Sequence, residues 1–155
     1  MESRTRQPPV IGFSAYSGTG KTTLLKKLIP LLRQQNLKLA VIKHAHHQFE
    51  IDHPGKDSYE LRMADANQVL ISSSKRKALI TEFDEHEEEP GLQSLIGELN
   101  LDKLDLILVE GFKQEHFMKI ELHRKVLHKP YLHLDDQDII AVVADHDLSD
   151  STHLP

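Results

Sequence analysis

Short apolar runs alternate with segments of helical periodicity along most of the chain. Val10–Ser14, Leu37–Lys43 and Ile139–Ala144 are dominated by apolar residues, as is typical of strands that are covered on both faces. Between the first two runs, residues 21–35 carry leucines at the spacing of one helix face. Strands that alternate with helices predict an α/β fold with a mostly parallel sheet.

Residues 21–35 form the first of three predicted helices. Pro30 falls inside this segment, so we expect a kink or a missing hydrogen bond one turn earlier, and Asn36 is a plausible C-cap. A short helix is predicted over Ser58–Ala66. An amphipathic helix is predicted over Pro90–Leu101, which carries apolar residues on one face.

Three further segments have the pattern of strands. Gln68–Ser73 and Arg76–Phe83 are joined by a polar turn, which predicts a hairpin or a short antiparallel addition at the edge of the sheet. Phe117–Arg124 alternates in the manner of a strand. Its apolar positions are Met118, Ile120 and Leu122, and its polar positions are Lys119, Glu121 and His123.

The segment between the first strand and the first helix carries the clearest chemistry. Residues 15–22 read Ala-Tyr-Ser-Gly-Thr-Gly-Lys-Thr, which matches the phosphate-loop (Walker A) pattern G-x-x-x-x-G-K-[ST] with alanine in place of the first glycine. Gly18 and Gly20 allow backbone N–H groups to turn toward an anion, and the helix N-terminus adds unpaired donors. We expect Lys21 to reach the β- and γ-phosphates and the Thr22 hydroxyl to hold Mg²⁺.

A glycine-rich turn without a ligand could match this pattern by accident. The strand before it and the helix after it favour the phosphate loop, and they predict a three-layer P-loop NTPase fold. The predicted phosphate-binding residues are Ser17, Gly18, Thr19, Gly20, Lys21, Thr22 and Thr23.

Three carboxylates are candidates for the same site. Glu110 follows a buried apolar run, so it is the candidate Walker B residue that orients Mg²⁺ directly or through water, with Gly111 allowing a close turn; the alternative is a surface acid after a core strand. Asp57 can cap the helix that follows it, face Mg²⁺ and water, or do both at once. Together, Glu110 and Asp57 are the candidate catalytic residues. Asp145 is the candidate reader of a guanine base, or else a turn residue that ends its strand.

The histidines after the second strand invite a metal-site interpretation. His44, His46 and His47 lie within four residues, but neighbouring positions on an extended strand point to opposite faces. A nucleotide-sensing loop over residues 44–58, at the C-terminal edge of the sheet, is the preferred interpretation.

Composition narrows the function classes. A length of 155 residues predicts a single nucleotide-binding domain, with residues 1–9 as a loose tail. The net charge of -5 argues against broad nucleic-acid binding, and the absence of cysteine is compatible with a cytoplasmic location. The polar first residues have no targeting signal, and no apolar run has transmembrane length, so we expect no membrane association.

Four strings together resemble the molybdopterin-guanine dinucleotide biosynthesis protein B (MobB) family, over roughly Val10 to Asp147. They are Ser-Gly-Thr-Gly-Lys-Thr-Thr-Leu-Leu-Lys-Lys-Leu-Ile-Pro from Ser17, Ile-Lys-His from Ile42, Pro-Gly-Lys-Asp-Ser-Tyr-Glu-Leu-Arg from Pro54, and Leu-Asp-Leu-Ile-Leu-Val-Glu-Gly-Phe-Lys from Leu104.

The resemblance implies a GTP-binding homodimer that is an accessory or adapter to the guanylyltransferase MobA when GMP is attached to molybdopterin. Molybdopterin is a further candidate partner. In matching positions, Gly18, Gly20, Lys21 and Thr22 would bind phosphates and Mg²⁺, with Asp57 and Glu110 facing them. Family members usually continue into a further C-terminal segment and helix, whereas this sequence stops at Pro155, so we expect an uncovered sheet face or an altered dimer.

Two other functions remain open at this level. A small-molecule kinase would have the same loop, but it needs an arginine-rich lid, and only Arg62, Arg76 and Arg124 follow the first helix, widely scattered. A nickel or cobalt delivery GTPase is suggested by the 11 histidines. Because these scattered arginines form no visible lid over the phosphates, we expect at most a weak GTPase activity.

Overall fold

The structure is a computed structural model that describes residues 7–45, 49–84, 86, 88–148 and 155. The chain separates into two units. One consists of Met1–His44 with Gly91–Pro155, and the other of Ala45–Pro90. The single domain expected from chain length stays a prediction.

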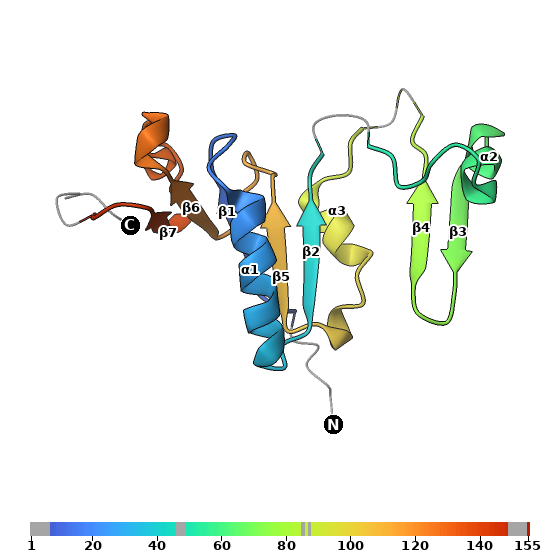
Figure 1. Cartoon of the computed structure of the whole chain (residues 1–155), viewed down its shortest axis with the longest axis horizontal. Helices are drawn as coiled ribbons and strands as arrows, with labels where there is room; N and C mark the ends of the chain where they lie inside the picture. Colours follow the sequence, from blue (N-terminus) through green and yellow to red (C-terminus); the bar gives the residue numbers. More distant parts are fainter. Residues whose placement is uncertain (1–6, 46–48, 85, 87, 149–154) are drawn as a thin grey trace. The chain divides into compact units, whose positions relative to one another are not determined.

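A sheet of five parallel strands organises the first unit (Figure 1). Its strands are β1 (Val10–Ser14), β2 (Leu39–Lys43), β5 (Leu106–Glu110), β6 (Lys119–His123) and β7 (Ile139–Ala144), in the order β2-β5-β1-β6-β7. Phe13 and Lys43 are both in register with Glu110. The C-terminal ends of the three neighbouring strands therefore meet at one edge of the sheet, where open α/β folds bind ligands.

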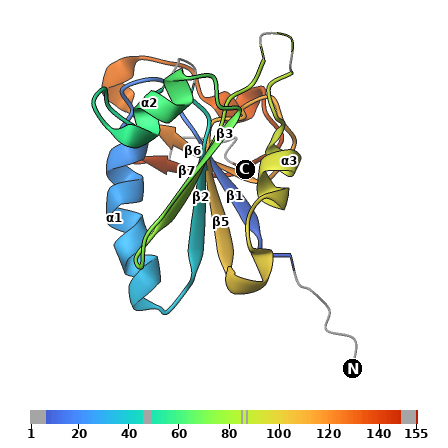
Figure 2. The ribbon, with the colours of Figure 1, turned by 90° about the vertical axis from the view of Figure 1, so that its right-hand side faces the viewer.

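Two helices cover opposite faces of this sheet (Figure 2). The leucine stripe of α1 (Lys21–Gln34) packs on the face that carries Phe13, Leu108 and Leu122. The short helix α3 (Leu92–Gly97) packs on the other face, against Ile107 and Val109. Since neighbouring β5 residues point to opposite faces, one strand serves both cores. The predicted three-layer α/β fold is confirmed, and single-turn 3₁₀ helices span Leu101–Lys103 (η1), Lys125–Leu127 (η2) and Leu132–Leu134 (η3).

The end of α1 differs by one residue from the sequence expectation. The helix continues through Pro30 to Gln34, and its C-cap is Gln35. Asn36 lies just beyond the cap with φ of 63°, and its N–H donates to the Arg33 carbonyl over 3.0 Å. Asparagine suits this left-handed position, so it ends the helix from the site next to the expected one.

The second unit contains helix α2 and a hairpin. α2 spans Asp57–Met63, and β3 (Gln68–Ser72) pairs antiparallel with β4 (Lys77–Thr81). The hairpin is confirmed, and its two strands form a sheet of their own. Arg62 forms ion pairs with Glu50 and with Glu82, the latter over 3.0 Å, so one guanidinium joins three segments of this unit.

The capping role considered for Asp57 is wrong. The N-cap of α2 is Lys56, and no side chain forms a cap hydrogen bond. Instead, the Glu60 carboxylate accepts from the Gly55 N–H over 3.2 Å. Asp57 is an exposed residue of the first helical turn.

Strand β6 buries its polar residues as well as its apolar ones. The strand expected within Phe117–Arg124 is confirmed, and Lys119, Glu121 and His123, the polar positions of its alternation, are only 1%, 0% and 9% exposed. The Glu121 carboxylate accepts from the N–H groups of Leu132 (2.8 Å) and His133 (3.0 Å) and contacts His133 Nδ1 at 2.9 Å. The segment after β6 therefore folds over the polar face and satisfies it.

Among the residues that the structure describes, no helix is long and apolar enough to cross a membrane.

Candidate functional site

The predicted phosphate loop joins β1 to α1 through a turn with two left-handed glycines. Gly18 has φ of 79° and Gly20 has φ of 103°, values that other residues adopt only under strain. Between them, the buried Thr19 hydroxyl donates to the Tyr16 carbonyl over 2.7 Å, and the Thr19 N–H donates to the same oxygen over 3.3 Å. Contacts within the loop thus fix its conformation.

Ala15 explains why the loop can depart from the usual pattern. Its side chain is fully buried and belongs to the core cluster of Phe13, Leu25 and Leu108. A methyl group therefore adds packing at the position where the pattern has glycine.

The first turn of α1 presents donors that its own residues leave unpaired. Gly20 is the N-cap, so no side chain caps the helix, and the first turn contains no acidic residue. The first helical hydrogen bond runs from the Leu24 N–H to the Gly20 carbonyl over 2.9 Å. The exposed Thr22 and Thr23 lie in this turn. Free N–H groups and the positive end of the helix dipole are the features that bind phosphate.

Lys21 folds back over the loop. Its ammonium group donates to the Ala15 carbonyl over 3.2 Å. Burial lowers the pKa of Lys21 from its ordinary value; the Lys113 and Lys43 ammonium groups lower it further, and the Glu110 carboxylate opposes them. Three lysines and one carboxylate thus act on one another at this edge of the sheet.

Glu110 ends β5 beside the loop. Its carboxylate lies 3.9 Å from the Lys43 ammonium, and its carbonyl accepts from the His44 N–H over 2.8 Å. Gly111 follows with φ of 107°, and a Cβ added there would lie 2.5 Å from the Cβ of His44. The chain can turn this closely only because residue 111 is glycine, as the sequence predicted.

Two cations near this site were missed by sequence reasoning. Lys43 ends β2, and Lys113 lies three residues after Glu110. The Lys113 carbonyl accepts from the buried Lys119 ammonium over 3.1 Å, which ties the loop after β5 to β6. The signal for Lys113 was present in the Val-Glu-Gly-Phe-Lys string, where the lysine follows the candidate Mg²⁺ carboxylate.

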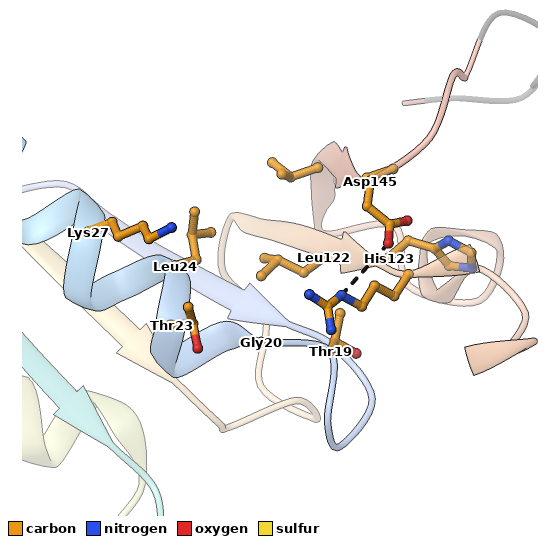
Figure 3. Close-up of a pocket in the computed structure, with 11 residues that line it drawn as sticks. Thr19, Gly20, Thr23, Leu24, Lys27, Leu122, His123 and Asp145 are labelled. Atoms are coloured by element: carbon orange, nitrogen blue, oxygen red, sulfur yellow. Dashed lines mark ion pairs between the residues drawn. The ribbon is translucent and has the colours of Figure 1, made fainter. Parts of the chain in front are cut away.

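A pocket of about 230 Å³ lies on the other side of the loop, at the ends of β6 and β7. It is lined by Thr19, Gly20, Thr23, Leu24, Lys27, Leu122, His123, Arg124, Val143, Ala144 and Asp145. Figure 3 shows Asp145 across this pocket from Thr23 and Lys27 of α1. The structure therefore brings Asp145 close to the phosphate loop, from which it is separated by more than a hundred residues of sequence.

Asp145 is also tied to its own turn. One carboxylate oxygen, Oδ1, accepts from the Lys125 N–H over 3.1 Å and contacts His146 Nδ1 at 3.2 Å. The hydrogen bond from Lys125 lowers the pKa of Asp145, and the bond with His146 adds to this effect. The other oxygen, Oδ2, lies 3.7 Å from Arg124 Nε. Asp145 is therefore both the turn residue that ends its strand and a part of the pocket wall.

Arg124 is a further cation whose position near the loop the sequence did not reveal. It is remote from every motif string in the sequence, yet it lines the pocket with Thr19, Gly20 and Thr23. The parallel order of β1, β6 and β7 produces this proximity.

The structure does not place several of the predicted residues at this site. Asp57 belongs to the second unit, so its approach to Mg²⁺ stays a prediction. His46 and His47, the centre of the possible metal site, lie outside the described residues. Within the described part of the chain, no group of three or more His, Cys, Asp or Glu side chains is arranged to hold a metal ion.

Comparison with known proteins identifies the family. The sequence model of molybdopterin guanine dinucleotide synthesis protein B matches residues 10–145. The chain belongs to this family. The MobB resemblance drawn from the four sequence strings is therefore confirmed.

Two curated relatives agree. The chain is 51% identical to the molybdopterin-guanine dinucleotide biosynthesis adapter protein of Escherichia coli, over 88% of this chain and 78% of that protein. It is 41% identical to the protein of the same name from Haemophilus influenzae, over 92% and 78% of the two chains.

Solved structures show the same fold. A crystal structure of molybdopterin-guanine biosynthesis protein B has 27% identity and a TM-score of 0.67, covering 89% of this chain and 82% of that one. Bacillus subtilis MobB has 22% identity and a TM-score of 0.69, covering 94% and 85%.

Proposed function

We propose that this chain binds GTP with Mg²⁺ through its phosphate loop and acts as a nucleotide-dependent adapter for the guanylyltransferase MobA in molybdopterin guanine dinucleotide formation. The observation that carries the proposal is the open first turn of α1, which no side chain caps, next to Lys21 and two left-handed glycines. Membership of the MobB family, which includes a molybdopterin-guanine dinucleotide biosynthesis adapter protein, indicates the pathway in which the chain would act.

The residues around the loop fit a magnesium nucleotide. The phosphates would lie on the N–H groups of residues 17–23, with Lys21 as a charged donor. Mg²⁺ prefers oxygen ligands, and Thr22 and Glu110 offer a hydroxyl and a carboxylate, directly or through water, with Asp57 as a further candidate. When bound, the ion would neutralise charge on the β- and γ-phosphates. The lysines around Glu110 add to this positive environment.

The base would occupy the pocket at the ends of β6 and β7. Glu110 lies at the end of β5, on one side of β1, and the pocket lies on the other side. If the metal end of the triphosphate points to Glu110, the nucleoside end points to the pocket. There, Asp145 would accept from the N1 and N2 positions of guanine.

A titration tests the binding part of this proposal. A fluorescent GTP analogue is titrated against wild-type protein and Lys21→Ala, with and without Mg²⁺. We expect an affinity loss of about ten- to a hundredfold for the variant, because a charged hydrogen bond is worth about 1.5–3 kcal/mol. Lys103→Ala, a lysine in η1 before β5 begins, is the matched control. Unchanged GTP affinity in Lys21→Ala would contradict the loop assignment.

Hydrolysis by the isolated protein should be slow. Fast phosphoryl transfer needs a residue that positions water and a cation on the transferring group. Glu110 and Asp57 are the water-positioning candidates, but the proposal engages them with Mg²⁺, and Arg124 lies on the pocket side of the loop. We expect a single-turnover rate on the order of 10⁻³ per second or lower. A rate near one per second, or phosphate transfer to a small acceptor, would favour a kinase instead.

A homodimer is the expected assembly. The hairpin β3–β4 has two strand edges, and strand edges are commonly covered by another copy of the chain. Light scattering at micromolar concentration should return about twice the chain mass of 17.7 kDa. A mass of one chain would contradict the dimer and leave the nucleotide site untouched.

A further inference from the structure

The wall of the pocket opposite α1 carries a cation and an anion side by side. Arg124 follows β6 and Asp145 follows β7, and both line the pocket with residues of the phosphate loop. Their closest charged atoms, Arg124 Nε and Asp145 Oδ2, are 3.7 Å apart. The two side chains are 50% and 46% exposed, so this pair is open to a ligand.

The ion pair adds little to the stability of the fold, because half-exposed pairs of this kind contribute little to folding. Within the described part of the chain, the Arg124 guanidinium makes no hydrogen bond, although it has five donors. Asp145 Oδ1 is held by the Lys125 N–H and by His146 Nδ1, while Oδ2 faces Arg124 Nε at 3.7 Å. One carboxylate oxygen is therefore fixed by the turn, and the other lies beside the guanidinium at a distance longer than a good hydrogen bond.

Guanine presents a matching pair of groups. Its O6 and N7 atoms are acceptors, which the arginine fork binds in a bidentate manner. Its N1–H and N2 amino groups are donors, which suit a carboxylate, and N1 is bonded to the carbon that carries O6. Adenine carries an amino group in place of O6, so its donors would face the donors of an arginine.

We propose that Arg124 is a second guanine-reading residue, which donates to O6 and N7 while Asp145 accepts from the N1 and N2 edge. This inference rests on the proposed function, because it needs the base to lie in the β6–β7 pocket. Lys125 and His146 then serve as positioning residues, since their contacts with Oδ1 aim Oδ2 at the pocket.

Base analogues separate the two readers. GTP, ATP and 7-deaza-GTP, which keeps O6, N1–H and the 2-amino group and has a C–H group in place of N7, are titrated against wild-type protein, Arg124→Ala and Arg124→Lys. Arg33→Ala, an exposed arginine in the last turn of α1, is the matched control.

We expect the wild type to bind GTP about fivefold more tightly than 7-deaza-GTP, because the analogue loses one of the two acceptors assigned to Arg124. Arg124→Ala should lose most of this preference because GTP binding weakens more than analogue binding, and Arg124→Lys should restore it in part. Arg33→Ala should behave as wild type.

Three outcomes would overturn the inference. If Arg124→Ala weakens all three nucleotides by the same factor, the arginine binds phosphate or ribose, or supports the fold. If Arg124→Ala changes nothing, the guanidinium does not touch the nucleotide. In both cases, binding of GTP that depends on Lys21 would leave the proposed function standing. If the wild type shows no such binding, the proposed function and this inference both fail.

Discussion

Two sets of polar groups in the first unit, one beneath β6 and one at the phosphate loop, differ in whether the chain itself provides their hydrogen-bond partners. Beneath β6, the carboxylate of Glu121 has three contacts with the segment 132–133, and Lys119 has an ion pair with Asp136 at 3.0 Å. At the phosphate loop, no side chain caps α1. Polar groups that the fold pairs support structure, and polar groups that it leaves unpaired at an open edge are suited to a ligand.

His123 is an exception among the paired polar residues beneath β6. His123 Nε2 contacts the Lys129 carbonyl at 2.9 Å, and its ring stacks on Tyr131 with centroids 4.0 Å apart. The other ring nitrogen, Nδ1, is buried without a hydrogen-bond partner among the described residues. A carbonyl can only accept, so Nε2 is the donor of this contact. The stacking with Tyr131 nevertheless fixes this ring, so His123 belongs with the residues that support structure.

The comparison predicts that Glu121→Ala has the largest effect, and that the effect is on stability. The substitution removes the acceptor of two buried backbone N–H groups and one contact of the His133 ring, which should lower the free energy of unfolding by about 3–5 kcal/mol. Urea denaturation measures this change, with Glu98→Ala at the exposed end of α3 as control. A loss below about 1 kcal/mol would remove the structural role assigned to the buried set.

Asp145→Ala should have a smaller effect, and on binding. Removing the carboxylate should weaken GTP by about tenfold, or ~1.5 kcal/mol, and leave ATP little changed. Competition by ATP and GTP against a fluorescent analogue measures the preference. A guanine preference that survives in Asp145→Ala would move the base reader elsewhere, and equal competition in the wild type would refute guanine selectivity.

Lys113→Ala should have the smallest effect. The residue is exposed, so folding should not change, but its charge acts on Lys21 at the edge where the γ-phosphate is proposed to lie. We expect GTP to lose about fivefold in affinity, or ~1 kcal/mol, and GDP to lose less. Calorimetric titration with both nucleotides gives the ratio, with Lys103→Ala as control. An equal loss for GTP and GDP would show that Lys113 does not distinguish the γ-phosphate.

The sequence predicted the parts of the site that lie in one continuous string. β1, the loop and α1 follow one another without interruption, and Glu110 with Gly111 ends a strand whose apolar run is easily seen. In each case the local pattern and the tertiary environment require the same residues, so one sequence was enough.

The missed parts depend on contacts between distant segments. Arg124 reaches the loop only because β6 lies beside β1, an order that strand patterns do not determine. The polar face of β6 resembled a solvent-facing one because its partners, Leu132, His133 and Asp136, arrive from the following segment. Alternation reports the polarity of a face and not what covers it.

The adapter role is tested most directly by the affinity of this protein for the guanylyltransferase MobA in different nucleotide states. Calorimetry would compare wild-type protein without nucleotide, with GTP and Mg²⁺, and with GTP alone, and would repeat the series with Lys21→Ala. If nucleotide binding is coupled to partner binding, GTP with Mg²⁺ should change the MobA affinity of the wild type by about fivefold or more, and Lys21→Ala should not respond. A wild-type protein that binds GTP yet has the same affinity for MobA in every state would contradict the account.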